Sequence, residues 1–116
     1  MQRPEPEDKA RDLRGKVLRA KELIGYQDSA IVSREIVGGE KGTITIFSFD
    51  EGESLSEHTA PFDAVISILE GQAEVIIAGE SYHLGTGEMI IMPARIPHAI
   101  KAIKRFKMLL TLIRQD

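Results

Sequence analysis

The sequence contains no cysteine, which removes several kinds of chemistry at once. The chain has no disulfide bonds, no thiolate metal ligands and no cysteine nucleophile. An excess of basic residues is absent as well, because 15 lysines and arginines stand against 18 aspartates and glutamates, for a net charge of −3. Nucleic-acid binding needs a basic face or stripe, so we expect no nucleic-acid partner.

Long apolar runs are also missing from the sequence. Residues 1–16 carry charges of both signs and two prolines, without the apolar stretch that a signal peptide needs. Elsewhere the longest purely apolar runs are a few residues, against about 20 for a membrane span. We therefore expect a cytoplasmic, soluble protein that does not contact a membrane.

What the chain does have is enough apolar material for one core. Hydrophobic residues make up 42% of 116 positions, which fits a single domain. The exception is residues 1–16, whose composition cannot offset the entropy of ordering, and we predict a flexible charged arm there. Residues 17–116 then form the domain, in which residues 17–24 (VLRAKELI) fit either a short helix or an edge strand.

After residue 24, apolar side chains recur with a period close to two, which is typical of β-strands. The predicted strands, separated by turns rich in glycine and proline, are Ile31–Val37, Thr43–Phe49, Ala64–Leu69, Gln72–Ala78, Ser81–Leu84, Glu88–Met92, His98–Ile103 and Phe106–Ile113. No helical period of useful length appears beyond residue 24. The pattern indicates an all-β protein, an antiparallel sandwich or barrel.

Two segments have the spacing of paired sequence motifs. The matching positions are Gly52, His58 and Gly71 in the first segment, and Gly87, Pro93 and His98 in the second. In this spacing the chain resembles the cupin superfamily, and in particular its small single-domain conserved-barrel (cupin 2) proteins. The resemblance implies a double-stranded β-helix, or jelly-roll barrel, of the RmlC-like type, with an interior pocket beside the two histidines.

The chain departs from the cupin pattern where most members of the family bind a metal. Ala60 and Ala64 stand at the positions of a second histidine and a glutamate, so only His58 and His98 of the four usual ligands are present. Two imidazoles alone make a weak site for a first-row metal. The resemblance therefore implies a degenerate metal motif.

Three roles for the two histidines follow. They could ligate a weakly bound divalent transition metal (Fe, Mn, Ni, Zn or Cu), or serve an organic ligand as polar or acid–base groups, or be inert core residues. Asp63 is a candidate third metal ligand, although regular strand alternation would aim it away from the pocket. Glu57 directly neighbours His58 and is a poorer candidate.

Replacing two ligands by alanine enlarges the pocket and makes it more apolar, as pockets for organic ligands are. The expected lining is His58, Ala60, Phe62, Ala64, Met92, Arg95 and His98, with Met89 as a further candidate. Arg95 replaces a motif glycine, and it either binds a carboxylate or phosphate of the ligand or is solvated. His83 matches no motif position, and we assign it to the surface.

Three functions stay open at this point. The first is a small-molecule binding module without a full metal site. The second is a metal-dependent enzyme of oxygenase or isomerase type, and the third is a non-catalytic regulatory or scaffold dimer. We also expect a homodimer, because so small a barrel leaves sheet edges to be covered, and Ile31–Val37 or residues 17–24 could reach across to a second copy.

Overall fold

The computed structural model describes residues 12–116, so most of the predicted arm lies outside the described residues. The elements are a short 3-10 helix η1 (Ala20–Leu23) and the strands β1 (Ile31–Gly39), β2 (Gly42–Phe49), β3 (Ser54–His58), β4 (Phe62–Glu70), β5 (Gln72–Ile77), β6 (Glu80–Gly85), β7 (Met89–Met92), β8 (His98–Ala102) and β9 (Phe106–Arg114). The all-β prediction is confirmed, and each predicted strand is present. Strand β3 was not predicted, and residues 17–24 contain the short helix rather than an edge strand.

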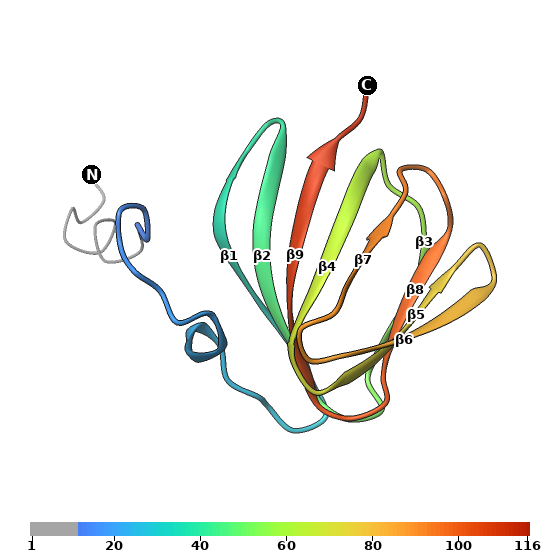
Figure 1. The fold of residues 1–116 in the computed structure, drawn as a ribbon, viewed down its shortest axis with the longest axis horizontal. Coiled ribbons are helices and arrows are strands. Elements are labelled where there is room, and N and C mark those ends of the chain that lie inside the picture. Colours follow the sequence, from blue (N-terminus) through green and yellow to red (C-terminus); the bar gives the residue numbers. More distant parts are fainter. Residues whose placement is uncertain (1–11) are drawn as a thin grey trace, which may run out of the picture.

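The strands form two antiparallel sheets that face each other (Figure 1). One sheet has five strands in the order β1-β2-β9-β4-β7, and the other has four in the order β3-β8-β5-β6. Consecutive strands repeatedly cross from one sheet to the other, which is the topology of a double-stranded β-helix. No helix within residues 12–116 is long and apolar enough to cross a membrane.

The core lies between the two sheets and is built from alternate residues of each strand. In β4, Ala64, Ile66 and Ile68 are buried, while the residues between them are only partly so. Phe49 and Phe106 stack with ring centroids 4.5 Å apart at one end of this core. The period of two in the sequence therefore corresponds to one face of each strand packing inward.

One glycine of the first motif is fixed by a close approach of the backbone. Gly71 links β4 to β5 with a φ of +88°, and a Cβ there would overlap the carbonyl group of Arg105. Only glycine combines this left-handed conformation with the absence of a side chain. The motif glycine is thus needed for the chain to cross from the five-stranded sheet to the four-stranded one.

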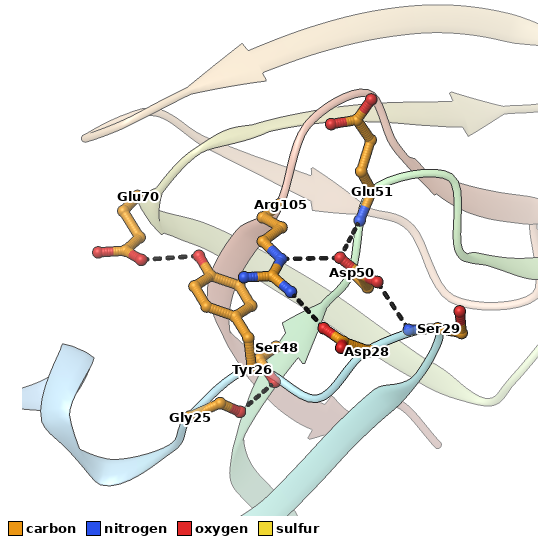
Figure 2. A network of polar contacts seen from close by, with 9 residues as sticks. All are labelled: Gly25, Tyr26, Asp28, Ser29, Ser48, Asp50, Glu51, Glu70 and Arg105. Atoms are coloured by element: carbon orange, nitrogen blue, oxygen red, sulfur yellow. Dashed lines mark hydrogen bonds and ion pairs between the residues drawn. The ribbon is translucent and has the colours of Figure 1, made fainter.

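A network of polar contacts attaches the segment before β1 to the outside of the barrel (Figure 2). The hydroxyl of Tyr26 donates to Glu70 Oε2 at 2.7 Å, and the Arg105 guanidinium lies 5.0 Å from the centroid of the tyrosine ring. Arg105 also donates to Asp28 and Asp50, at 2.9 and 2.7 Å. The bond from Arg105 to Asp50, together with those from the backbone N–H groups of Ser29 and Glu51, lowers the pKa of Asp50 to about 2.

Candidate functional site

The barrel encloses a cavity of about 110 Å³ at the end where the two motif histidines lie. Its lining consists of His58, His98 and nine apolar side chains: Leu55, Ala60, Phe62, Ala64, Met92, Ile100, Met108, Leu110 and Leu112. Both sheets contribute to this lining. Among residues 12–116, the two imidazoles are therefore the only polar side chains that line the cavity.

Six of the seven residues expected from the sequence line this cavity, and Arg95 is the exception. Met92 is 2% exposed and faces inward, whereas Met89 is 60% exposed on the other face of β7. The two methionines are an odd number of positions apart, so a strand places them on opposite faces. Met89 as a lining residue was therefore wrong. His83 lies at the surface of β6, 4.0 Å from Glu74, as assigned from the sequence.

The two histidines face each other because β3 and β8 pair with His58 directly opposite His98. Their rings meet edge to face, with centroids 4.4 Å apart, and their Nε2 atoms are 3.2 Å apart. His98 is 4% exposed, while His58 is exposed at the barrel mouth. The pair therefore connects solvent to the interior of the cavity.

In both rings, the Nδ1 atom contacts a backbone carbonyl group. This contact determines which ring nitrogen carries the hydrogen. His58 Nδ1 lies 2.8 Å from the oxygen of Ser56, and His98 Nδ1 lies 3.1 Å from the oxygen of Ile96. A carbonyl oxygen only accepts, so each Nδ1 must carry the hydrogen and donate it. In the neutral rings both Nε2 atoms then present lone pairs toward each other.

The charged form of His98 is disfavoured by its burial. Burial lowers the pKa of His98, and the neighbouring charge of His58 lowers it further, while the bond to the carbonyl of Ile96 opposes both. At neutral pH the buried ring is thus neutral, and its Nε2 is an acceptor without a hydrogen. No hydrogen lies between the two Nε2 atoms, so water or an organic group can donate to them, and a cation can bind their lone pairs.

Asp63 positions the loop before His98 instead of facing the cavity. Its Oδ1 accepts a hydrogen bond of 2.8 Å from the backbone N–H of Ala94. Next along the loop, the backbone N–H of Arg95 donates to the carbonyl of Ala60, also at 2.8 Å. These two bonds hold the segment after Pro93 against the segment after His58, and so keep the two histidines together.

Arg95 takes the place of the motif glycine and adopts a backbone conformation that favours glycine. Its φ is +65°, in the left-handed region that glycine favours, and its guanidinium donates to the carbonyl of Gln115 at 2.8 Å. The side chain therefore reaches the C-terminal residues and does not line the cavity. Of the two roles expected for Arg95, this position does not suit contact with a ligand in the cavity.

The two imidazoles fall short of the full set of ligands that a tightly bound transition metal takes. Zinc and related metals in proteins take three or four protein ligands. Ala60 and Ala64 have no donor atoms, and Asp63 is bonded to the loop. Within residues 12–116, no group of three or more histidine, cysteine, aspartate or glutamate side chains is placed to hold a metal ion.

Five of the lining residues were not named from the sequence: Leu55, Ile100, Met108, Leu110 and Leu112. The alternation of β9 separates Met108, Leu110 and Leu112 from Leu109 and Thr111, but both sets contain leucine. The sequence alone therefore does not show which set faces inward. The buried fraction decides it, since Phe106 and Met108 are fully buried.

Comparison with known proteins agrees with this architecture. The family model described as a cupin domain matches residues 45–113. A conserved protein of unknown function from Streptococcus pyogenes is 37% identical, with 89% of this chain and 90% of that one covered and a TM-score of 0.84. A cupin superfamily protein from Desulfitobacterium hafniense is 28% identical, covering 88% and 94% of the two chains with a TM-score of 0.82.

A cupin 2 conserved barrel domain protein from Leptotrichia buccalis is 39% identical over 81% of this chain and 46% of its own length, with a TM-score of 0.79. No curated protein matches the chain. The matched region contains Gly52, His58, Gly71, Gly87 and His98, and of these the two histidines line the cavity just described. The chain belongs to the cupin domain family, as a small single-domain barrel with an altered metal motif.

Proposed function

We propose that the protein binds a small organic molecule in the cavity beside His58 and His98, without a resident metal ion. The observation that supports this most is the pair of Nε2 acceptors, 3.2 Å apart, at the mouth of an otherwise apolar cavity. Organic-ligand sites combine apolar walls with a few fixed polar groups in this way. Two acceptors that face each other without a hydrogen between them are poorly paired, and a ligand donor improves that pairing.

The cavity also suggests the size and chemistry of the ligand. A cavity of about 150 Å³ in another protein binds benzene, so 110 Å³ suits a compact molecule of similar size or smaller. Met92 and Met108 are flexible walls that can adapt to it. The ligand should have an apolar body and a hydroxyl or amino group that donates to His58 or His98.

Phenol and toluene are a matched pair of probes for this proposal, because they have equal numbers of heavy atoms and only phenol has a hydroxyl group. We expect phenol to bind more tightly, by about fivefold, since one satisfied hydrogen bond is worth about 1 kcal/mol. Titration followed by amide chemical shifts in NMR measures both affinities. Equal affinities would contradict a donor-specific site.

Variants locate the binding. His98→Leu should remove the preference for phenol, whereas His83→Leu, a change at an exposed histidine outside the cavity, should leave it intact. If neither probe shifts the resonances of cavity residues, the organic-ligand reading fails. That outcome would favour the regulatory or scaffold role.

A metal-dependent enzyme is the second candidate, because one specific observation favours it. Two Nε2 atoms 3.2 Å apart can share one ion at the usual metal–nitrogen distance of about 2.0–2.1 Å. Elemental analysis of protein purified without an affinity tag or chelator tests this. A near-stoichiometric amount of iron, manganese, nickel, zinc or copper would support the second candidate and overturn the first.

A further inference from the structure

An arginine ends the row of side chains through which β9 lines the cavity. Met108, Leu110 and Leu112 line the cavity, and they are alternate residues of this strand. Continued by two positions, the same alternation turns Arg114 toward the barrel mouth. The register agrees, because Arg114 lies opposite Phe62, which lines the cavity from β4, and residues directly opposite share one face of a sheet. Three apolar lining residues are therefore followed by a cation at the rim.

The guanidinium of Arg114 lies beside the cavity wall. It is 5.7 Å from the centroid of the Phe62 ring, a position in which the aromatic ring attracts a cation. Half of the Arg114 side chain is exposed, and on its solvent side it borders an open hollow in which Glu40 and Lys41 carry opposite charges. The guanidinium is thus accessible to a ligand that enters the cavity from solvent.

The backbone of residues 114 and 115 is held by the loops around the mouth. The N–H of Arg114 donates to the carbonyl of Lys41 at 2.9 Å, and the N–H of Gln115 donates to the carbonyl of Pro61 at 3.0 Å. The Arg95 guanidinium donates to the carbonyl of Gln115 from the loop between β7 and β8, at the same end of the barrel as the end of β9 (Figure 1). These bonds position Arg114 before a ligand arrives, which lowers the entropy cost of binding.

The acidic groups near Arg114 leave its guanidinium available. Within residues 12–116, its one ion pair is with Asp116, at 3.9 Å, and the Asp116 side chain is fully exposed. Ion pairs of this kind contribute little. Asp63 lies opposite Ile113 in the register, so it is on the other face of the sheet, where it is bonded to Ala94. Arg114 therefore keeps hydrogen-bond donors for an anion from outside the chain.

We propose that Arg114 binds a carboxylate of the ligand, so that the ligand is a small apolar carboxylic acid. This inference rests on the proposed function and adds a second polar contact to it. The apolar body occupies the cavity, a donor group contacts the histidines of the four-stranded sheet, and the carboxylate contacts Arg114 of the five-stranded sheet that faces it. The carboxylate contact suggested for Arg95 by the sequence is thus assigned to Arg114.

The chemistry of a single guanidinium favours a carboxylate. The two groups are planar and form two parallel charge-assisted hydrogen bonds. A phosphate monoester carries close to two negative charges, which one arginine does not balance. A carboxylate carries one charge, and it is small enough to stay at the rim while the apolar body fills the cavity.

Benzoate and nitrobenzene are matched probes, because both hold two oxygen atoms beside one benzene ring and only benzoate is charged at neutral pH. Neither donates a hydrogen bond, so this comparison is independent of the phenol and toluene test. We expect benzoate to bind at least about tenfold more tightly, since hydrogen bonds to charged groups are the stronger ones. Amide chemical shifts measure both affinities, and the Arg114 Nε–H resonance should shift with benzoate alone.

Arg114→Gln should lower the affinity for benzoate to that for nitrobenzene, a loss of at least about tenfold. Arg19→Gln is the matched control, because Arg19 is also exposed and also has an ion pair of 3.9 Å, with Glu22, but lies beside η1 and outside the cavity lining. It removes the same charge from the chain and should leave the preference for benzoate intact. Added salt should weaken the binding of benzoate more than that of nitrobenzene.

The outcomes separate this inference from the proposed function. Equal affinities for benzoate and nitrobenzene, with phenol still favoured over toluene, would overturn the inference and leave the proposed function standing. An equal loss of benzoate affinity in Arg114→Gln and Arg19→Gln would also overturn it, because the cause would then be net charge. If none of the four probes shifts the resonances of cavity residues, both proposals fail. If circular dichroism shows that Arg114→Gln is unfolded, the wild-type Arg114 Nε–H resonance decides: a shift with benzoate alone supports the inference, and no shift overturns it.

Discussion

Filling the cavity should stabilise the barrel while weakening ligand binding. An empty cavity destabilises a protein by about 24 cal/mol per Å³, so 110 Å³ corresponds to about 2.6 kcal/mol. Ala64 is 3% exposed and lines the cavity from β4. In Ala64→Val the two added methyl groups fill about half of this space, and valine loses little side-chain entropy in a strand.

We therefore expect Ala64→Val to raise the free energy of unfolding by about 1 kcal/mol, and the melting temperature by about 4 °C. Urea and thermal unfolding measure both values. Ala99→Val is the control, because Ala99 is buried on β8 but does not line the cavity. A loss of about 1 kcal/mol or more in Ala64→Val would mean that the space is already filled, and would refute the cavity itself.

Three further predictions concern the backbone and the histidine pair. Ala78 has a φ of +50° in the two-residue turn between β5 and β6, a conformation that asparagine adopts more readily than alanine. Ala78→Asn should therefore raise the free energy of unfolding in urea by about 1 kcal/mol. No increase would contradict the turn geometry. Arg95→Gly should be more stable than Arg95→Ala by about 1 kcal/mol. Both variants lose the hydrogen bond to Gln115, but only glycine adopts the left-handed φ without strain. Equal stabilities would argue against backbone strain at this position. The pKa of His98 is lower in the folded state than its ordinary 6.5, so the unfolded state binds more protons and stability should fall as the pH drops through 6.5. His98→Leu should flatten that dependence in urea titrations at several pH values, and an unchanged slope would place its cause at another group.

The sequence predicted most strands because alternation is a local property of the chain. It missed β3, whose sequence Ser54–His58 contains one large apolar residue, Leu55, among polar ones. This strand is held by pairing with β8, which is a long-range contact. A segment whose strand conformation depends on its neighbour cannot be predicted from its own composition.

The candidate site was predictable only where the motif spacing fixed it. The spacing of the two motifs identified His58 and His98. The same spacing placed Ala60 and Ala64 in the lining of the pocket. The sequence left the roles of Arg95 and Asp63 open, because these roles depend on partners far away in sequence, Gln115 and Ala94. The direction of the two Nε2 atoms depends on backbone carbonyl groups near each ring, which no side-chain pattern records.

The central claim is that two unprotonated Nε2 atoms converge at the mouth of the cavity, ready to accept a ligand's hydrogen. Long-range proton–nitrogen NMR spectra of the histidine rings at a pH above 7.5 test it directly, because they report which ring nitrogen carries the hydrogen; this pH is about one unit above the ordinary pKa. We predict the Nδ1–H tautomer for both His58 and His98, from their contacts with the carbonyl groups of Ser56 and Ile96. An Nε2–H tautomer in either ring would contradict the account.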